Sequence, residues 1–319
     1  MKLKAQLMQT LSEAQAPRVG VAAAAREAAA RETASQSGCP LCGRMGHQIV
    51  HLLEPVEIRR CGECGFVFAR GGAQNASEEG YYDSMGGYEP FLEAKKREWY
   101  ELFRDLAMRT PGRRLLEVGC ARGDALAMAR QFGWLPCGVE VSRDDAAYAR
   151  SEFGLVVHHG TVETCPFEEG SFDAALMWSV IEHIADPLPA LRACRRLLKP
   201  GGLLSIHTPN ADSKVARDLG PRWSMYHVPG HVSFFSPSTM RMALRKSGLE
   251  PVQLETGLGS RPVNIDPKAR MQFSPRRVAS YVATRLGLKE PLREMIYAMQ
   301  PKLREQGEFM AVVAKRNEE

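Results

Sequence analysis

The sequence lacks any long uninterrupted hydrophobic stretch. Its longest apolar run near the N-terminus, residues 19–25, is short and rich in alanine, and Arg26 and Glu27 follow it directly. A membrane-spanning helix needs about 20 apolar residues, and a secretory signal needs a stronger apolar core than this one. We therefore expect no membrane span and no signal peptide, and we expect the protein to be cytoplasmic.

A strong charge excess and internal repeats are missing as well. The 319 residues carry 42 Lys and Arg against 37 Asp and Glu, and 44% are hydrophobic, which is an ordinary globular composition. Residues 266–306 hold nine basic and four acidic residues, so the whole surplus lies there. We expect this stretch to present a solvated helix face, although it could instead attract an anionic substrate, nucleic acid or lipid headgroups. The sequence contains no repeat of fixed period, so nothing in it indicates a solenoid.

Eight cysteines are present, in two groups. Four are scattered among apolar neighbours and are expected to be buried, reduced thiols: Cys120, Cys137, Cys165 and Cys194. The other four form two C-x-x-C pairs separated by 18 residues: Cys39, Cys42, Cys61 and Cys64. A glycine follows each pair and permits the tight turn that directs both thiolates at one tetrahedral metal ion. We predict a zinc ribbon at residues 38–70, with a structural zinc because four thiolates close its coordination shell.

The chain on either side of the cysteine module differs in pattern. Residues 1–37 are expected to form a flexible tail, and residues 71–111 a linker followed by a helix, because apolar positions recur at helical spacing from Phe91 to Arg109. From residue 112 onward, strands and helices alternate. We predict strands at 115–118, 136–141, 155–158, 172–178 and 203–207, and helices at 124–132, 144–153 and 187–198. Such alternation predicts an α/β fold, with a parallel sheet covered by helices on both faces.

The end of the first predicted strand has the features of a nucleotide site. Ligands of such sheets bind beyond the carboxyl ends of the strands. Gly119 and Gly123 let the backbone pass close to a ligand, and the helix that follows Gly123 directs unpaired N–H groups toward it. Glu140 lies at the end of the second strand, 17 residues beyond Gly123. A carboxylate at this position can accept hydrogen bonds from both hydroxyls of a ribose.

Four blocks in this region resemble class I S-adenosylmethionine-dependent methyltransferases. They are LEVGCARG at 116–123, PFEEGSFD at 166–173, VIEHIADP at 180–187 and LLKPGG at 197–202, in the order of that family. TPN at 208–210, GPRW at 220–223 and HVSFFS at 231–236 resemble its ubiquinone-biosynthesis-like subgroup. The resemblance implies a Rossmann-like, seven-stranded methyltransferase domain at 112–319. Its last two strands would form an antiparallel pair at 251–255 and 308–314. Apolar positions at helical spacing between them indicate a helical insertion at 262–306, which could form a lid, form a dimer surface or simply pack against the core.

The resemblance also implies the residues that bind S-adenosylmethionine. They are Glu117, Gly119, Cys120, Ala121, Gly123, Glu140, Val141, Thr161, Val162 and Trp178. Two of them depart from the family pattern. Ala121 replaces the middle glycine, and its methyl group is expected to be tolerated if the backbone φ is negative. Thr161 follows the third strand, where the family usually has an acidic residue; its hydroxyl would accept a hydrogen bond from the adenine amino group.

The predicted reaction is methylation of a small molecule or a glycan, with oxygen as the acceptor atom. A sulfonium methyl is already activated, so the enzyme supplies alignment and, for a hydroxyl, a general base. Histidine suits that role, and His183, His207, His227 and His231 lie at or beyond strand ends. We favour His231, then His227, although both could merely hold their loop by hydrogen bonds. The motifs include no group of carboxylates with divalent-metal spacing, so magnesium dependence is not expected.

Two other functions remain open. The ribbon and the basic segment 276–304 could bind RNA as the methyl acceptor, or the chain could be a non-catalytic, cofactor-binding assembly factor. Residues 38–70 contain four arginines and three glutamates, so phosphate affinity of the ribbon would be weak. A homodimer is a further alternative to a monomer. The sequence does not name the acceptor, because acceptor contacts come from variable loops.

Overall fold

The structure is a computed structural model that describes residues 38–71, 88–228, 230–257 and 307–317. The predicted tail at 1–37 and insertion at 262–306 lie outside these residues. Within them, no helix has both the length and the apolar character that crossing a membrane requires.

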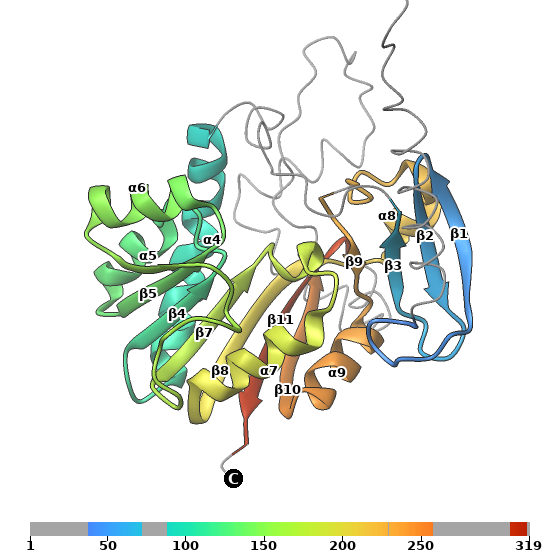
Figure 1. Ribbon diagram of the computed structural model, residues 1–319. Helices are drawn as coiled ribbons and strands as arrows, with labels where there is room; N and C mark the ends of the chain where they lie inside the picture. The colour runs from blue at the N-terminus through green and yellow to red at the C-terminus, as the bar shows by residue number, and fades with distance from the viewer. Residues whose placement is uncertain (1–37, 72–87, 229, 258–306, 318–319) are drawn as a thin grey trace, which may run out of the picture.

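A seven-stranded sheet forms the centre of the fold (Figure 1). Its strands run in the order β10-β11-β8-β7-β4-β5-β6. All neighbouring pairs from β8 to β6 are parallel, whereas β11 is antiparallel to both β8 and β10. The bounds are β4 (Arg114–Val118), β5 (Leu135–Glu140), β6 (Val156–His159), β7 (Phe172–Trp178), β8 (Leu198–Pro209), β10 (Leu249–Gly257) and β11 (Phe309–Arg316). The prediction of a parallel sheet that ends in an antiparallel pair is confirmed.

Helices cover both faces of this sheet, as predicted (Figure 1). They are α4 (Tyr88–Arg109), α5 (Asp124–Ala129), α6 (Arg143–Phe153), α7 (Pro187–Leu197), the short α8 (Lys214–Leu219) and α9 (Pro237–Lys246), with 3₁₀ turns η1 (Arg130–Phe132), η2 (Ile181–His183) and η3 (Gly220–Arg222). Strand β7 shows the division: Ala174 and Leu176 pack with α4, α5 and α6, whereas Ala175 and Met177 pack with α7 and α9. Side chains alternate along a strand, so one buried strand supplies both layers of the core.

Strand β8 begins five residues earlier than predicted. The Lys-Pro-Gly-Gly segment lies between the predicted helix at 187–198 and the predicted strand at 203–207, but Leu198 already pairs with Phe172, and the register shifts before Ala174 pairs with Leu203. Gly201 takes a φ of 77° within this irregular stretch, a left-handed value that glycine adopts without strain. The segment is therefore an irregularity inside the strand.

A second, four-stranded sheet contains the cysteine module. Its order is β1 (His47–Leu53), β2 (Val56–Cys61), β3 (Val67–Arg70) and β9 (Ser233–Phe234). Strand β9 comes from the chain beyond β8 and pairs antiparallel with β3. Phe66, directly before β3, and Phe235, directly after β9, pack with ring centroids 5.0 Å apart. The sheet of the module is thus completed by the α/β part of the chain (Figure 1).

Candidate active site and metal centre

The loop between β4 and α5 is tightly packed at its two glycines. A Cβ at Gly119 would lie 2.6 Å from Val180 Cγ2, and a Cβ at Gly123 would lie 2.6 Å from Leu155 Cδ1. Both glycines also have positive φ, 69° and 85°. Any larger residue at either position would clash and adopt a strained backbone. The loop therefore depends on both glycines to hold its shape at the carboxyl end of β4.

Ala121 lies between them with a φ of 45°, so the condition set for tolerance of its methyl group, a negative φ, is not met. An L-residue in this left-handed region costs roughly 1–2 kcal/mol. The loop backbone is held there by a hydrogen bond from Ala121 N to Glu140 Oε2 at 2.8 Å. Strain of this kind persists where surrounding contacts fix the conformation, as happens at ligand sites.

Glu140 links the loop to the end of β5. Its side chain is 7% exposed, Oε2 accepts from Ala121 N, and Oε1 accepts from Ser142 N at 2.8 Å. Burial raises the pKa of this carboxyl, while the two backbone bonds act in the opposite direction. Each carboxylate oxygen has two lone pairs, so each can accept one more hydrogen bond. Glu140 can therefore bind a pair of ribose hydroxyls while it holds the loop.

Glu117 is a second buried carboxyl in the same place. It is 5% exposed, and its Oε2 has no hydrogen-bond partner among the described residues. Burial raises its pKa to about 8, and repulsion from Glu140 and Asp124 adds to the rise. A buried polar atom without a partner needs an explanation. A cationic ligand group beside Glu117 would supply the missing partner.

The other predicted cofactor residues lie near the carboxyl ends of β4, β5, β6 and β7. Val141 follows β5 and is 68% exposed, and Thr161 is also exposed. Thr161 Oγ1 lies 3.3 Å from Thr164 Oγ1. Cys120 and Val162 are instead buried in the apolar core. Val141 and Thr161 are therefore the more accessible to a ligand.

Three parallel rings lie across the carboxyl ends of β7 and β8 and the start of β11. The centroid of His207 is 4.7 Å from that of Trp178 and 5.2 Å from that of Phe309. Trp178 Nε1 and His207 Nδ1 are buried without a hydrogen-bond partner among the described residues. Burial, reinforced by the Lys95 cation, lowers the pKa of His207 to about 3. His207 is therefore too weak a base for the role considered for it.

Two other histidines, His183 and His231, lie close together. His231 is 6% exposed, and its ring lies edge-on to that of His183 with centroids 4.7 Å apart. His231 Nδ1 is 2.7 Å from the Met225 carbonyl oxygen, and His183 Nδ1 is 3.1 Å from that of Gly230. A carbonyl oxygen only accepts, so each Nδ1 carries the hydrogen. In the neutral rings, Nε2 is then the basic nitrogen.

Glu182 completes a cluster with these two histidines. It is 2% exposed, and its Oε2 accepts from Thr208 Oγ1 at 2.9 Å. One ligand atom from each of Glu182, His183 and His231 lies within 4.8 Å of the others. Such a set can share a proton or hold a metal ion. His227 is more distant, with its ring 5.9 Å from that of His231.

The four cysteines of the module converge as predicted. Cys39 Sγ lies 3.6 Å from Cys64 Sγ, and Cys42 Sγ lies 3.5 Å from Cys61 Sγ. Four thiolates about 2.3 Å from a tetrahedral zinc lie about 3.8 Å from each other, whereas a disulfide would need about 2.05 Å. Backbone N–H groups of both turns donate to the sulfurs of Cys39, Cys61 and Cys64. The donor set fits a closed zinc site.

Comparison with known proteins decides the enzyme class of this chain. Residues 87–254 match Methyltransf_23, a family described as a methyltransferase domain. The chain belongs to this methyltransferase family. Its enzyme class is S-adenosylmethionine-dependent methyl transfer.

Similar methyltransferases include enzymes of known name. The ubiquinone biosynthesis O-methyltransferase of Cereibacter sphaeroides is 33% identical over 177 residues, covering 51% of this chain and 71% of the relative. The enzyme of the same name from Roseobacter denitrificans is 34% identical over 165 residues, covering 48% and 66%. A putative sarcosine dimethylglycine methyltransferase from Galdieria sulphuraria has a similar fold, with a TM-score of 0.54, 18% identity, and coverage of 76% of this chain and 99% of that one.

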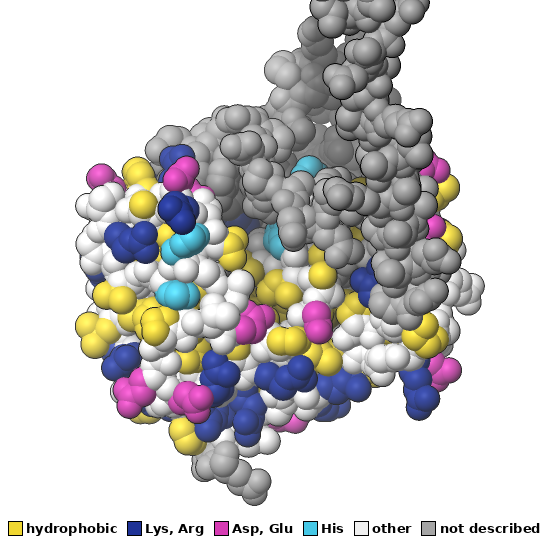
Figure 2. All heavy atoms as spheres, viewed as in Figure 1, with side chains coloured by type: hydrophobic (Ala, Val, Ile, Leu, Met, Phe, Trp, Pro, Cys, Tyr) yellow, Lys and Arg dark blue, Asp and Glu magenta, His cyan; other side chains and the backbone are white. Residues whose placement is uncertain are grey.

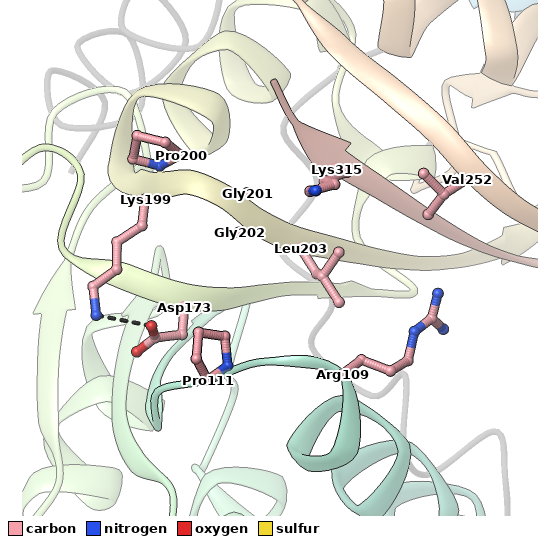
Figure 3. Close-up of a pocket in the computed structure, with 10 residues that line it drawn as sticks. All are labelled: Arg109, Pro111, Asp173, Lys199, Pro200, Gly201, Gly202, Leu203, Val252 and Lys315. Carbon is pink, nitrogen blue, oxygen red and sulfur yellow. Dashed lines mark hydrogen bonds and ion pairs between the residues drawn. The ribbon is translucent and has the colours of Figure 1, made fainter. Parts of the chain in front are cut away.

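A different cavity lies at the opposite end of this methyltransferase sheet. It has a volume of about 530 Å³ and is lined by Arg109, Lys199 and Lys315, among others (Figure 3). The buried Asp173 holds this end together, accepting from Arg114 N at 2.9 Å and Lys199 Nζ at 2.8 Å. The cavity borders the amino ends of β7 and β8, whereas cofactors of such sheets bind at the carboxyl ends. It is separate from the loop between β4 and α5.

Basic side chains also gather along the lower edge of the face shown in Figure 2. The last turns of α7 and α9 carry Arg195, Arg196, Arg245 and Lys246. Helix C-termini carry partial negative charge, which favours cations there. Helix ends account for these four residues without a ligand.

Proposed function

We propose that this methyltransferase transfers a methyl group from S-adenosylmethionine to a hydroxyl oxygen of a small molecule, with His231 as the general base. The observation that carries the proposal is the cluster of His231, His183 and Glu182. Its position beside the cofactor loop supports it, because Val180, two residues before Glu182, packs against Gly119. The names of the ubiquinone biosynthesis O-methyltransferases support a small-molecule acceptor.

The cofactor contacts follow from the crevice. Gly119 and Gly123 give close access to the backbone, Glu140 accepts from the ribose, and the Glu117 carboxylate meets the ammonium group. Val141 offers an exposed apolar surface to the adenine. The remaining proposed contacts are Cys120, Ala121, Thr161, Val162 and Trp178. S-adenosylmethionine supplies an activated methyl group at this site.

Three features of the cluster allow His231 to act as the base. Its Nδ1–H bond to Met225 fixes the tautomer, so Nε2 takes the hydroxyl proton as the oxygen gains the methyl group. The nearby Glu182 carboxylate stabilises the imidazolium that results. Burial of the cluster excludes water and strengthens this electrostatic contribution. A positioned base of this kind contributes about 10²–10⁴-fold to the rate.

We further propose that Cys39, Cys42, Cys61 and Cys64 bind one structural zinc ion. All four positions of a tetrahedral zinc would be occupied by thiolates, which leaves no position for a substrate. Residues 38–70 thus serve the fold, and the chemistry takes place at the edge of the larger sheet.

Substitution of His231 tests the base. We expect His231→Ala to lower kcat on a phenolic acceptor by about 100-fold or more, with S-adenosylmethionine affinity unchanged. His227→Ala should have a smaller effect. The rate of His231→Ala should recover as pH rises, because a phenol then ionises by itself. Full activity of His231→Ala would overturn the assignment of the base.

Cofactor binding by the wild type without transfer to small hydroxyl compounds would overturn the proposed function. Strongly salt-dependent transfer to RNA would replace it with RNA methylation.

A further inference from the structure

The segment that carries His231 lies between the cysteine module and the η2 turn. On one side, Ala69 N of the module donates to Val232 O at 2.9 Å. On the other side, Val232 N donates to Glu182 O at 2.8 Å. Val232 directly follows His231. The backbone of Val232 therefore links the module to Glu182 at the position next to the proposed base.

Ser233 repeats this connection at the next position. Its backbone pairs with Phe68 of β3, while its Oγ donates to Ile184 O at 2.7 Å. Ile184 directly follows His183. Hydrogen bonds thus tie the module to residues directly beside His231 and His183. These bonds fix the distance between the two imidazoles.

The apolar core continues through the same junction. Phe66 and Cys61 are at most 1% exposed and belong to one buried cluster with Phe235 and Ile181, the first residue of η2. Strand β3 begins at Val67, three residues after Cys64. A metal ion that ties Cys61 and Cys64 to the other turn therefore fixes the position at which β3 meets β9.

We infer that the cysteine module is a positioning element for the acceptor-side cluster, so that zinc in the module keeps His231 and His183 competent for methyl transfer. This inference rests on the proposed function. Cofactor binding is set elsewhere, because Glu140 takes its hydrogen bonds from Ala121 and Ser142, neither of which belongs to the module. Loss of zinc lowers the transfer rate and leaves cofactor affinity intact.

Two substitutions of one cysteine separate zinc from the residue change. Cys64→Ser removes a ligand, whereas Cys64→His offers an imidazole that zinc accepts in Cys₃His sites. Cys64 is only partly buried, which favours the larger side chain. Cys137→Ser, on β5 and outside the module, is the control for a lost thiol. Each protein is measured for zinc content, cofactor affinity by calorimetry, and kcat and KM.

The expected pattern is specific. The wild type and Cys64→His contain one zinc per chain and Cys64→Ser contains none. We expect kcat of Cys64→Ser to fall at least tenfold with cofactor affinity within twofold of wild type, and Cys64→His to recover most of the loss. Cys137→Ser should match wild type. Full kcat in zinc-free Cys64→Ser would overturn the inference, and so would an equal loss of cofactor affinity.

A milder change covers the case in which Cys64→Ser fails to fold. Ser233→Ala removes only the bond to Ile184 O, and Ser205→Ala removes a buried hydroxyl from β8 as its control. We expect kcat to fall about fivefold in Ser233→Ala alone. Equal kcat in the two variants would contradict the inference.

Nitrogen-15 NMR of His231 gives a readout that does not require turnover. We expect a protonated Nδ1 in the wild type, as the bond to Met225 requires, and a mixture of tautomers in zinc-free Cys64→Ser. An unchanged tautomer would show that the module does not position His231. If the wild type methylates no small hydroxyl compound, the proposed function fails, yet the NMR result still decides the positioning role.

Discussion

The carboxylate of Glu140 accepts a hydrogen bond from the backbone N–H of Ala121 at 2.8 Å. This bond joins the end of β5 to the loop that leaves β4, and it holds Ala121 in a left-handed conformation. The same carboxylate is the group that we propose for the ribose. Cofactor binding and loop geometry thus depend on one side chain.

Replacement of Ala121 by glycine tests the strain in this loop. Ala121→Gly should relieve roughly 1–2 kcal/mol of left-handed strain and lose about 0.5–1 kcal/mol to the greater flexibility of the unfolded chain. We expect the free energy of unfolding to rise by up to about 1.5 kcal/mol, with cofactor affinity retained. Urea denaturation measures the change. Ala127→Gly, in the interior of α5, is the matched control and should destabilise by about 1 kcal/mol; equal losses in both variants would contradict the strain.

Glu117 predicts a pH dependence of cofactor binding. Its pKa of about 8 keeps the carboxyl protonated at neutral pH in the free protein. The cationic ammonium group of the cofactor favours the carboxylate, so binding should release a proton and strengthen as pH rises toward 8. Calorimetry at pH 7 in buffers of different ionisation enthalpy measures that proton. Glu117→Gln should bind without the release, and an unchanged proton count in this variant would exclude Glu117.

The same shift predicts how the stability of the free protein responds to pH. A carboxyl whose folded pKa is raised holds its proton in the native state after the unfolded chain has lost it. Between the ordinary carboxyl pKa and about 8, the native state therefore binds more protons, and this contribution to stability falls as pH rises. Thermal unfolding across this window should show a steeper decline in wild type than in Glu117→Gln.

Local patterns were sufficient to predict the larger sheet and to place Gly119 and Glu140 at the carboxyl ends of two neighbouring strands. Alternating strands and helices left clear periodic signals, and the glycines of the first loop have a direct steric requirement. The sequence could not predict the φ of Ala121, because that angle is held by Glu140 from another strand. In that case a distant contact determined a local conformation.

The pairing of His183 with His231 was also missed. The adjacent Glu182 and His183 were visible within their block, but His231 lies 48 residues beyond His183. They meet because Val232 N donates to Glu182 O at 2.8 Å and Gly230 O lies 3.1 Å from His183 Nδ1. The strand of this segment, β9, has only two residues and carries no periodic signal. The completed ribbon sheet escaped prediction for the same reason.

Calorimetric titration of S-adenosylmethionine into wild type and Glu140→Ala tests the crevice most directly, with the exposed Glu152→Ala on α6 as control. The account predicts micromolar-range binding to wild type and to the control, and at least tenfold weaker binding to Glu140→Ala, about 1.4 kcal/mol. Equal affinity in all three proteins would contradict it.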